Sequence, residues 1–180
     1  MDTRRLETGR LLLRPFGPAD LEALYLLLRD EEVNAFLPWF PVKDLEETRQ
    51  FYEQRFMGQA YSLAICQKGD DIPIGYIKAG TGDSRDFGYA LRREFWHRGI
   101  ATEAGRALVD QLREDHVPYI TATHDKNNPR SGGVMRQIGM HYCYSYVEQW
   151  QPKNFPGTFR MYQLNLDGRG GRVHSAYWER

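Results

Sequence analysis

The sequence predicts an α/β (α+β) domain in which a mixed, mostly antiparallel sheet of six to seven strands is flanked by about four helices. Apolar runs at 61–67 and 72–79, joined by a turn at 68–71, indicate a hairpin of antiparallel strands. Residues 86–123 have the pattern of a strand, a helix and a second strand, which places those two strands parallel with a right-handed crossover. The sheet is therefore mixed, and we expect its helices to lie on its faces.

The N-terminal elements follow from periodicity and from helix-capping residues. A first strand is expected from Leu11 to Phe16, and a helix opens at Pro18 because apolar residues then recur at helical spacing. The two prolines of FLPWFP (36–41) end that helix. Asp44 is expected to cap a second helix, since Glu47 follows three residues later as in a capping box.

The C-terminal half supplies the remaining elements. Asn128 and Pro129 favour the start of a helix, and Gly139 suits its left-handed end. The expected elements are a strand at 86–95, a helix at 101–114, a strand at 118–123, a helix from 128 to 139, and strands at 140–149 and 158–166. The full order is β-α-α-β-β-β-α-β-α-β-β. Residues 1–166 then form one domain, and 167–180 a loose extension on which Tyr177 and Trp178 are able to dock.

Composition narrows the class of protein. A chain of 180 residues is long enough for one domain with a sizeable core. Lys and Arg number 24 and so do Asp and Glu, and this balance speaks against a general nucleic-acid binder. The two cysteines show no zinc-site spacing, and His124–Asp125 lacks a third ligand, so no metal is expected. A charged N-terminus and the lack of a long apolar run predict a cytoplasmic protein without a signal peptide or a membrane span.

The junction WHRGIAT (96–102) lies where a strand gives way to a helix. The first amides of a helix have no partner within it, and the helix dipole makes that end positive. Gly99 allows close approach of the backbone, Ala101 keeps the position after next small, and His97 and Arg98 add positive charge. The junction is therefore either a phosphate-binding site or a structural turn. The sequence contains neither a P-loop nor a dinucleotide-binding glycine motif.

Four stretches in order resemble one family: RLLLRPF, IGYIKAG, YALRREFWHRGIATEA and NNPRSGGVMRQIGM. They are similar to the GNAT superfamily of acetyl-CoA-dependent N-acetyltransferases and, more narrowly, to the branch of ribosomal-protein-alanine N-acetyltransferases. The resemblance covers about residues 8–166 and implies a GNAT-like fold. One departure concerns the Q/R-x-x-G-x-G/A motif, since Trp96 stands at its Q/R position and His97 stands where a glycine usually follows.

The resemblance implies transfer of an acetyl group from acetyl-CoA to a primary amine by direct attack in a ternary complex. The amine is either a protein N-terminal α-amine or a small molecule. The pantetheine arm is expected between strands 87–91 and 119–123, with an amide at Ala90 or Leu91 facing the thioester oxygen. The residues expected to bind the cofactor are Ala90, Leu91, Arg92, Trp96, His97, Arg98, Gly99, Ile100, Ala101, Thr102 and Asn128.

The resemblance also suggests candidates for proton transfer. Ser131 is expected near the sulfur of the leaving thiolate, although a serine in a first helical turn also bonds backbone. Asp86 or Glu148 is the candidate base, directly or through water, and His124 and His141 are weaker candidates for a relay. Basic residues that could meet the 3′-phosphate of the coenzyme are Arg92, Arg93, Lys126, Arg130 and Arg136.

Two aromatic stretches, PWFP (38–41) and QWQPKNFP (149–156), are expected to wall the acceptor pocket or only to cover the edge of the core. Two other classes of function remain open from the sequence. A non-catalytic module that binds acyl-CoA would share the same loop, and a nucleic-acid-binding protein is disfavoured by charge. A homodimer through the final strands is compatible with the sequence.

Overall fold

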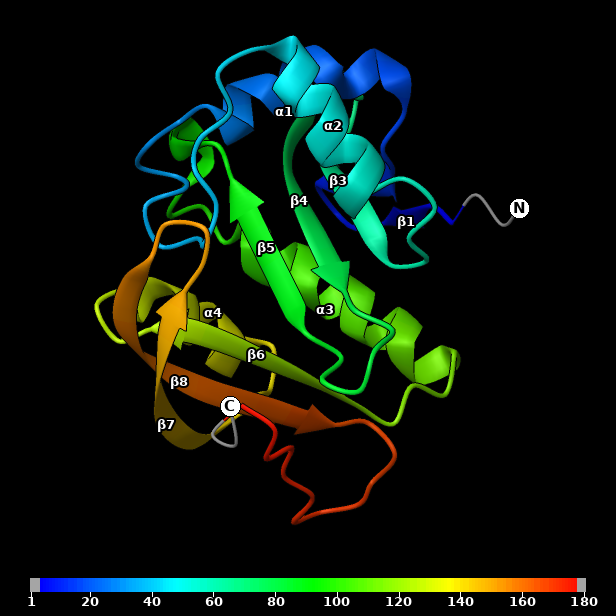
Figure 1. Cartoon of the computed structure of the whole chain (residues 1–180). Coiled ribbons are helices and arrows are strands. Elements are labelled where there is room, and N and C mark those ends of the chain that lie inside the picture. Colours follow the sequence, from blue (N-terminus) through cyan, green and yellow to red (C-terminus); the bar gives the residue numbers. More distant parts are fainter. Residues whose placement is uncertain (1–3, 178–180) are drawn as a thin grey trace.

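A computed structural model describes residues 4–177 and shows an α/β fold with helices on both faces of its larger sheet (Figure 1). The α-helices of this region are α1 (Leu21–Leu28), α2 (Leu45–Arg55), α3 (Ile100–Glu114) and α4 (Pro129–Gln137), and short 3-10 turns are η1 (Pro18–Asp20) and η2 (Arg93–Phe95). The strands are β1 (Leu6–Glu7), β2 (Leu11–Pro15), β3 (Ser62–Gln67), β4 (Pro73–Ala79), β5 (Phe87–Leu91), β6 (Tyr119–Asp125), β7 (His141–Trp150) and β8 (Phe155–Asn165).

The strands form two antiparallel sheets. A five-stranded sheet has the order β1-β2-β3-β4-β5, and a three-stranded sheet has the order β6-β8-β7. The parallel contact predicted by the β-α-β unit is one bridge between Asp86 and Thr121, which joins β5 to β6. The predicted fold class and helix count are confirmed. The strand arrangement differs in detail, because eight strands form two sheets instead of one sheet of six to seven strands, and the short β1 is an additional strand.

Two apolar layers sandwich the five-stranded sheet. On one face, the strands pack against α3 and α4 through residues such as Leu13, Ile77 and Leu108. On the other face, they pack against α1 and α2 through Leu24 and Tyr76. Alternate residues of a strand point to opposite faces, and the residues of β5 accordingly divide between the two layers.

Local chemistry confirms most predicted helix ends. The side chain of Asp44 accepts a hydrogen bond from the amide of Glu47 at 2.8 Å, as the capping-box pattern predicts. Gly139 has φ of 98°, the left-handed conformation expected after α4. Asn128 occupies the N-cap position of α4, but its side chain makes no capping hydrogen bond with the described residues. The strand predicted at 86–95 is too long, since it ends at Leu91 and the 3-10 turn η2 follows.

The C-terminal segment crosses the outer face of the three-stranded sheet. The hydroxyl of Tyr144 donates to the carbonyl O of His174 at 2.6 Å, and the rings of Tyr177 and Tyr146 stack with centroids 5.5 Å apart. Trp178, the other residue expected to dock, lies outside the described residues. Across residues 4–177, no helix combines the length and apolar character that a membrane crossing requires.

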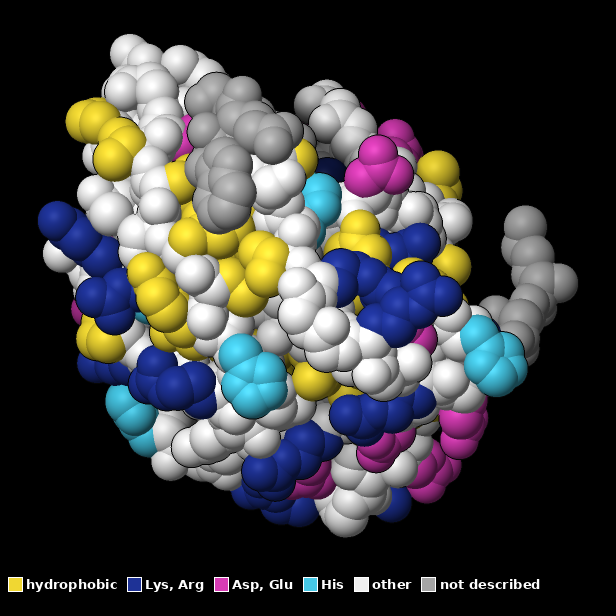
Figure 2. Space-filling view, turned by 90° about the horizontal axis from the view of Figure 1, so that it is seen from below, with side chains coloured by type: hydrophobic (Ala, Val, Ile, Leu, Met, Phe, Trp, Pro, Cys, Tyr) yellow, Lys and Arg dark blue, Asp and Glu magenta, His cyan; other side chains and the backbone are white. Residues whose placement is uncertain are grey.

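The charged side chains are mixed on the face seen in Figure 2. Lys and Arg side chains lie there in several separate groups, with His, acidic and apolar side chains between them. This distribution agrees with the formal net charge of zero.

Candidate active site

The centre of the candidate site is the place where the backbones of β5 and β6 diverge. The chain touches β6 directly before β5 begins, where the amide of Thr121 donates to the carbonyl O of Arg85 at 3.2 Å next to the Asp86–Thr121 bridge. The backbones of the two strands then diverge, with α4 behind them (Figure 1), and we call the region between their facing backbone edges the wedge. This is the region in which the sequence analysis places the pantetheine arm.

The pairing of β5 with β4 decides which of its amides face this wedge. The amide of Arg92 donates to the carbonyl O of Ile74 at 2.9 Å, so even-numbered residues of β5 bond to β4. In an antiparallel pair, the residues between them turn their amides to the other side. Of the two candidates for the thioester oxygen, Ala90 therefore directs its amide toward β4, whereas Leu91 directs its amide toward the wedge. The carbonyl O of Leu91 accepts from Trp96 Nε1 at 2.8 Å.

The loop 96–102 has the local geometry of an anion site. His97 and Gly99 both have positive φ, of 60° and 70°, and Gly99 is the N-cap of α3. The amides of residues 97–102 donate to no acceptor among the described residues. A helix N-terminus alone leaves about four amides without partners, so the turn at 97–98 extends the series. The result is a run of six amides next to the positive end of a 15-residue helix.

The side chains of this loop divide between buried ones that pack in the core and exposed ones. Ile100 and Thr102 are buried, and Thr102 Oγ1 donates to Gln137 Oε1 of α4 at 2.8 Å. Ala101 is half-buried, and the side chains of His97 and Arg98 are exposed. The cofactor role predicted for residues 97–102 is therefore one that their backbone can perform.

The five basic residues expected near the 3′-phosphate are not equivalent. Arg92 pairs with Glu94 at 2.5 Å, Arg93 pairs with Asp30 at 2.7 Å, and Arg136 donates to the Tyr162 hydroxyl at 3.0 Å. Arg130 lies over the ring of Trp96, 5.5 Å from its centroid. Arg130 and Lys126 have no ion pair among the described residues, which leaves their charges available to an anionic ligand.

Ser131 lies in the first turn of α4 and contacts a tyrosine that sequence analysis did not single out. Tyr89 Oη lies 2.8 Å from Ser131 Oγ and 2.7 Å from the Ser131 carbonyl O. Because a carbonyl only accepts, Tyr89 donates to it, and the Ser131 hydroxyl then donates to Tyr89. Burial raises the pKa of Tyr89 well above its usual value, so the phenol stays neutral.

The other titratable candidates form no hydrogen bond or ion pair with Tyr89 or Ser131 among the described residues. Asp86 is at the start of β5 with Lys78 Nζ 3.8 Å away, and Glu148 on β7 accepts from Trp150 Nε1 at 3.2 Å. His141 is exposed. Asn128 donates its amide to the carbonyl O of Asp125 at 2.8 Å, which closes the turn into α4.

His124 is buried beneath α4, with 4% of its surface exposed. Its Nδ1 lies 2.7 Å from the carbonyl O of Asp125 and must donate to it, so Nε2 carries the lone pair. Within residues 4–177, Nε2 has no hydrogen-bond partner and faces Gly132, where an added Cβ would lie 2.5 Å away. Burial lowers the pKa of His124, which keeps the ring neutral.

The two aromatic stretches meet at one end of the wedge. The amide of Lys153 donates to the carbonyl O of Pro38 at 3.2 Å, and Lys153 Nζ donates to the carbonyl O of Asn34. Figure 1 shows the β7–β8 hairpin beside the α1–α2 loop. Several of the aromatic side chains are used within the protein: Trp150 stacks on Phe159, with ring centroids 4.2 Å apart. Phe40, at 61% exposure, is the most open.

Comparison with known proteins identifies the family. The sequence profile of the acetyltransferase (GNAT) domain matches residues 10–141. The chain belongs to the GNAT acetyltransferase family. YnaD of Bacillus subtilis strain 168, named an uncharacterized N-acetyltransferase, is 27% identical over 139 residues, which cover 75% of this chain and 81% of YnaD. The expected enzyme class, an acetyl-CoA-dependent N-acetyltransferase, is thereby confirmed.

Solved GNAT structures share the fold. An acetyltransferase from Bacillus anthracis superposes with a TM-score of 0.81 at 24% identity, covering 91% of this chain and 99% of its own. RimL, a ribosomal L7/L12 α-N-protein acetyltransferase solved in complex with coenzyme A, superposes with a TM-score of 0.75 at 19% identity, covering 92% and 100%. At these identities the likeness shows the common fold.

Proposed function

We propose that this chain transfers an acetyl group from acetyl-CoA to a primary amine, with the coenzyme diphosphate bound by the amides of residues 97–102. The observation that carries the proposal is the run of six amides without acceptors among the described residues, which begins at the exposed residues 97–99 and continues into the first turn of α3. Backbone amides suit a diphosphate because they supply many donors at close range and need no particular side chain. The coenzyme A complex of RimL, which shares the fold, supports the same ligand class.

The wedge between β5 and β6 would take the pantetheine arm. The amide groups of the pantetheine arm need hydrogen-bond partners, and the facing edges of the two strands supply both donors and acceptors. The amide of Leu91, directed into the wedge, is the better candidate for stabilising the thioester oxygen as that oxygen gains negative charge. Arg92 and Trp96 would contact the coenzyme where it enters the wedge. Ala90 would contribute only as part of strand β5, because its amide is directed toward β4.

The reaction proceeds by direct attack. The amine nitrogen forms a bond to the thioester carbon, the carbon–sulfur bond breaks, and sulfur leaves as a thiolate that takes up the proton released by nitrogen. Ser131 would donate a hydrogen bond to this thiolate, and Tyr89 would orient Ser131. Neither hydroxyl is a net acid, because a thiol of pKa about 8.5 is more acidic than either. Burial raises the pKa of Cys66 to about 12, so this thiol is a poor acyl carrier.

The acceptor is a primary amine that must attack in its neutral form. A free α-amine has a pKa of about 8 and a lysine of about 10.4, so a protein N-terminus or a small α-amine is the easier nucleophile. Asp86 or Glu148 would accept the proton that nitrogen releases, through water where the distance requires it, and the proton would pass from there to the thiolate. The loops joined at Lys153 would form the acceptor end of the site.

The test measures coenzyme binding and turnover separately. Calorimetry with coenzyme A should show binding that Gly99→Val removes, because φ of 70° strains a β-branched residue and distorts the loop. Release of free thiol from acetyl-CoA, measured with a panel of peptides and small amines, should identify an acceptor. An absence of heat with coenzyme A, together with no effect of Gly99→Val, would refute the proposal. Binding without turnover of any amine would favour a non-catalytic acyl-CoA-binding module.

A further inference from the structure

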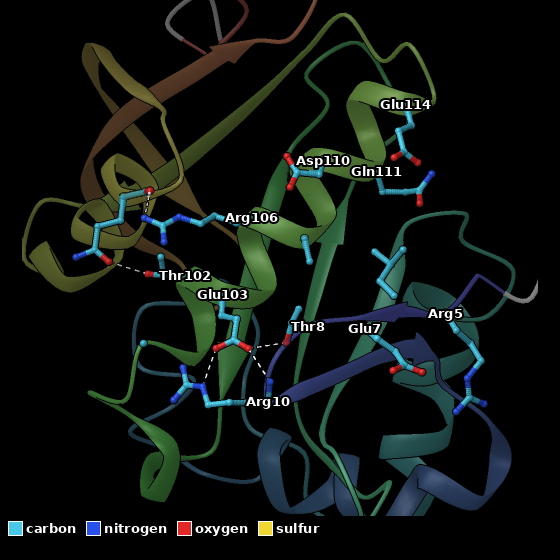
Figure 3. A pocket seen from close by; sticks show the side chains of 14 residues that line it. Arg5, Glu7, Thr8, Arg10, Thr102, Glu103, Arg106, Asp110, Gln111 and Glu114 are labelled. Carbon is cyan, nitrogen blue, oxygen red and sulfur yellow. Dashed lines mark hydrogen bonds and ion pairs between the residues drawn. The ribbon is translucent and has the colours of Figure 1, made fainter.

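Arg10 reaches loop 96–102 from the beginning of the chain, 88 residues away from its contact in the loop. Its Nη1 donates to the carbonyl O of Arg98 at 2.9 Å, and its Nε donates to Glu103 Oε2 at 2.7 Å. Figure 3 shows Arg10, Glu103 and Thr8 converging on one another beside the start of α3. A cavity of about 750 Å³ opens there, and its lining includes Arg5, Arg10 and Gly99.

The bond from Arg10 fixes the direction of an amide that it does not touch. In a planar trans peptide, the carbonyl of one residue and the amide of the next point in opposite directions. With the Arg98 carbonyl held toward Arg10, the amide of Gly99 points away from Arg10. The carbonyl O of Gly99 accepts from the amide of Glu103 at 3.0 Å, which directs the amide of Ile100 out of the helix end in the same way. Two successive peptide planes are therefore set by bonds to their carbonyls.

The same guanidinium also neutralises an unfavourable charge. Glu103 lies in the first turn of α3, where its carboxylate would repel an anionic ligand. Its Oε1 accepts from Thr8 Oγ1 at 2.5 Å and from the Arg10 amide at 3.0 Å, while Oε2 faces the Arg10 guanidinium. Burial by itself would raise the pKa of Glu103, but the bonds from Thr8 and Arg10 outweigh it and hold the pKa below its usual value.

We infer that Arg10 is a positioning residue for the coenzyme diphosphate, because it holds the Arg98–Gly99 peptide plane and offsets the charge of Glu103. The inference rests on the proposed function, since it requires a diphosphate at loop 96–102. A purely structural role would be small: the Arg10 side chain is 53% exposed, and ion pairs at such positions contribute little to stability. Binding is therefore the property that Arg10 should control.

The experiment compares two substitutions of Arg10 with a matched control in the full chain. Arg5→Gln removes the same charge from the same cavity, and Arg5 has no hydrogen bond or ion pair among the described residues. We expect Arg10→Gln to raise the Kd for coenzyme A about tenfold and Arg10→Lys roughly threefold, because one ammonium cannot bond both Arg98 and Glu103 in place of the planar guanidinium. Arg5→Gln should change the Kd by less than about twofold.

A second comparison separates positioning from general loss of activity. The value of kcat/KM is measured for acetyl-CoA and for S-acetylpantetheine, a donor with no diphosphate. Arg10→Gln should lower kcat/KM for acetyl-CoA through KM and leave that for S-acetylpantetheine within about twofold of wild type. The same loss with both donors would overturn the inference.

The remaining outcomes also decide the question. The inference fails if Arg10→Lys binds coenzyme A as wild type does, or if Arg10→Gln matches Arg5→Gln. Should Arg10→Gln fail to fold, Arg10→Lys, which keeps the charge, decides by the same comparison. If wild-type protein shows no binding of coenzyme A, the proposed function fails and this inference with it, whereas normal wild-type binding that Arg10 does not affect refutes this inference alone.

Discussion

The contact between Tyr89 and Ser131 allows the proposed role of Ser131 to be tested by a double-mutant cycle. In the resting protein the Ser131 hydroxyl donates to Tyr89 Oη across 2.8 Å. When a thiolate forms beside it, the hydroxyl exchanges this neutral acceptor for a charged one, and a charge-assisted hydrogen bond is the stronger of the two. Tyr89→Phe removes the neutral acceptor and leaves the hydroxyl free to turn to a backbone carbonyl of its own turn.

The size of each effect follows from the bonds lost. A hydrogen bond to a charged group contributes about 1.5–3 kcal/mol, and about 1.4 kcal/mol corresponds to tenfold in rate, so Ser131→Ala should lower kcat by about 10- to 100-fold. In Tyr89→Phe the Ser131 hydroxyl turns to a backbone carbonyl and away from the thiolate, and turning it back costs about one neutral hydrogen bond, about 1 kcal/mol, which corresponds to about fivefold in kcat. This variant also loses the bond from Tyr89 to the Ser131 carbonyl O at 2.7 Å, so we expect the melting temperature to fall by about 2–4 °C.

The assay is steady-state release of coenzyme A thiol at saturating amine, with wild type, both single variants and the double variant. If Tyr89 acts through Ser131, Tyr89→Phe should change kcat by less than about twofold once Ser131 is already alanine. The KM for acetyl-CoA should stay constant throughout. An undiminished fivefold loss in the Ser131→Ala background, or a Tyr89→Phe enzyme with full kcat, would refute the reasoning.

Three further predictions concern packing, pH and the acceptor. Gly132→Ala should lower the free energy of unfolding by about 1–3 kcal/mol, because the added Cβ would lie 2.5 Å from His124 Nε2. Gly133→Ala is the control and should raise the free energy of unfolding by about 0.5–1 kcal/mol, because nothing lies within 4 Å of its added Cβ. Equal changes for the two variants in urea titrations would contradict this prediction. Burial lowers the pKa of His124, so the unfolded chain binds its proton more readily, and the stability contributed by the neutral ring is present above about pH 6.5 and is lost as the pH falls toward the folded pKa. His124→Gln should flatten the stability curve below about pH 6.5, and an unchanged slope there would count against the assignment. Lys153→Met breaks the bond to the carbonyl O of Asn34 and should raise the KM for the amine alone, while an equal rise in the KM for acetyl-CoA would indicate a role in folding instead.

The elements that the sequence predicted well are those fixed by neighbouring residues. Asp44 caps α2 because its oxygen reaches an amide three residues ahead, and Gly139 ends α4 because a left-handed residue is needed there. Both signals lie within one turn of a helix. Asn128 shows the limit of such rules, since it stands at the N-cap but its side chain makes no capping bond with the described residues.

The contacts that sequence analysis missed join distant parts of the chain. Tyr89 and Ser131 are 42 residues apart, and Arg10 and Arg98 are 88 residues apart. No local periodicity records that these residues meet, because the meeting depends on how β5 lies against α4 and how β2 lies beside α3. Tyr89 offered one usable signal: its register in β5 places its side chain on the same face as Phe87, which packs toward the helix pair.

The single bridge between the two sheets means that backbone ladders do not hold the two halves of the molecule together. That task falls largely to the apolar cluster that both sheets share, whose members include Leu91 of β5, Leu108 of α3 and Ile120 of β6. Gln137 adds polar contacts between α3 and α4, since it accepts from Thr102 through its side chain and from Arg106 through its carbonyl O. Mild denaturant should therefore separate the two sheets before it unfolds either of them. In native-state hydrogen exchange, β5 and β6 would then lose protection at their facing edges while β3 and β8, in the middle of their sheets, still retain it.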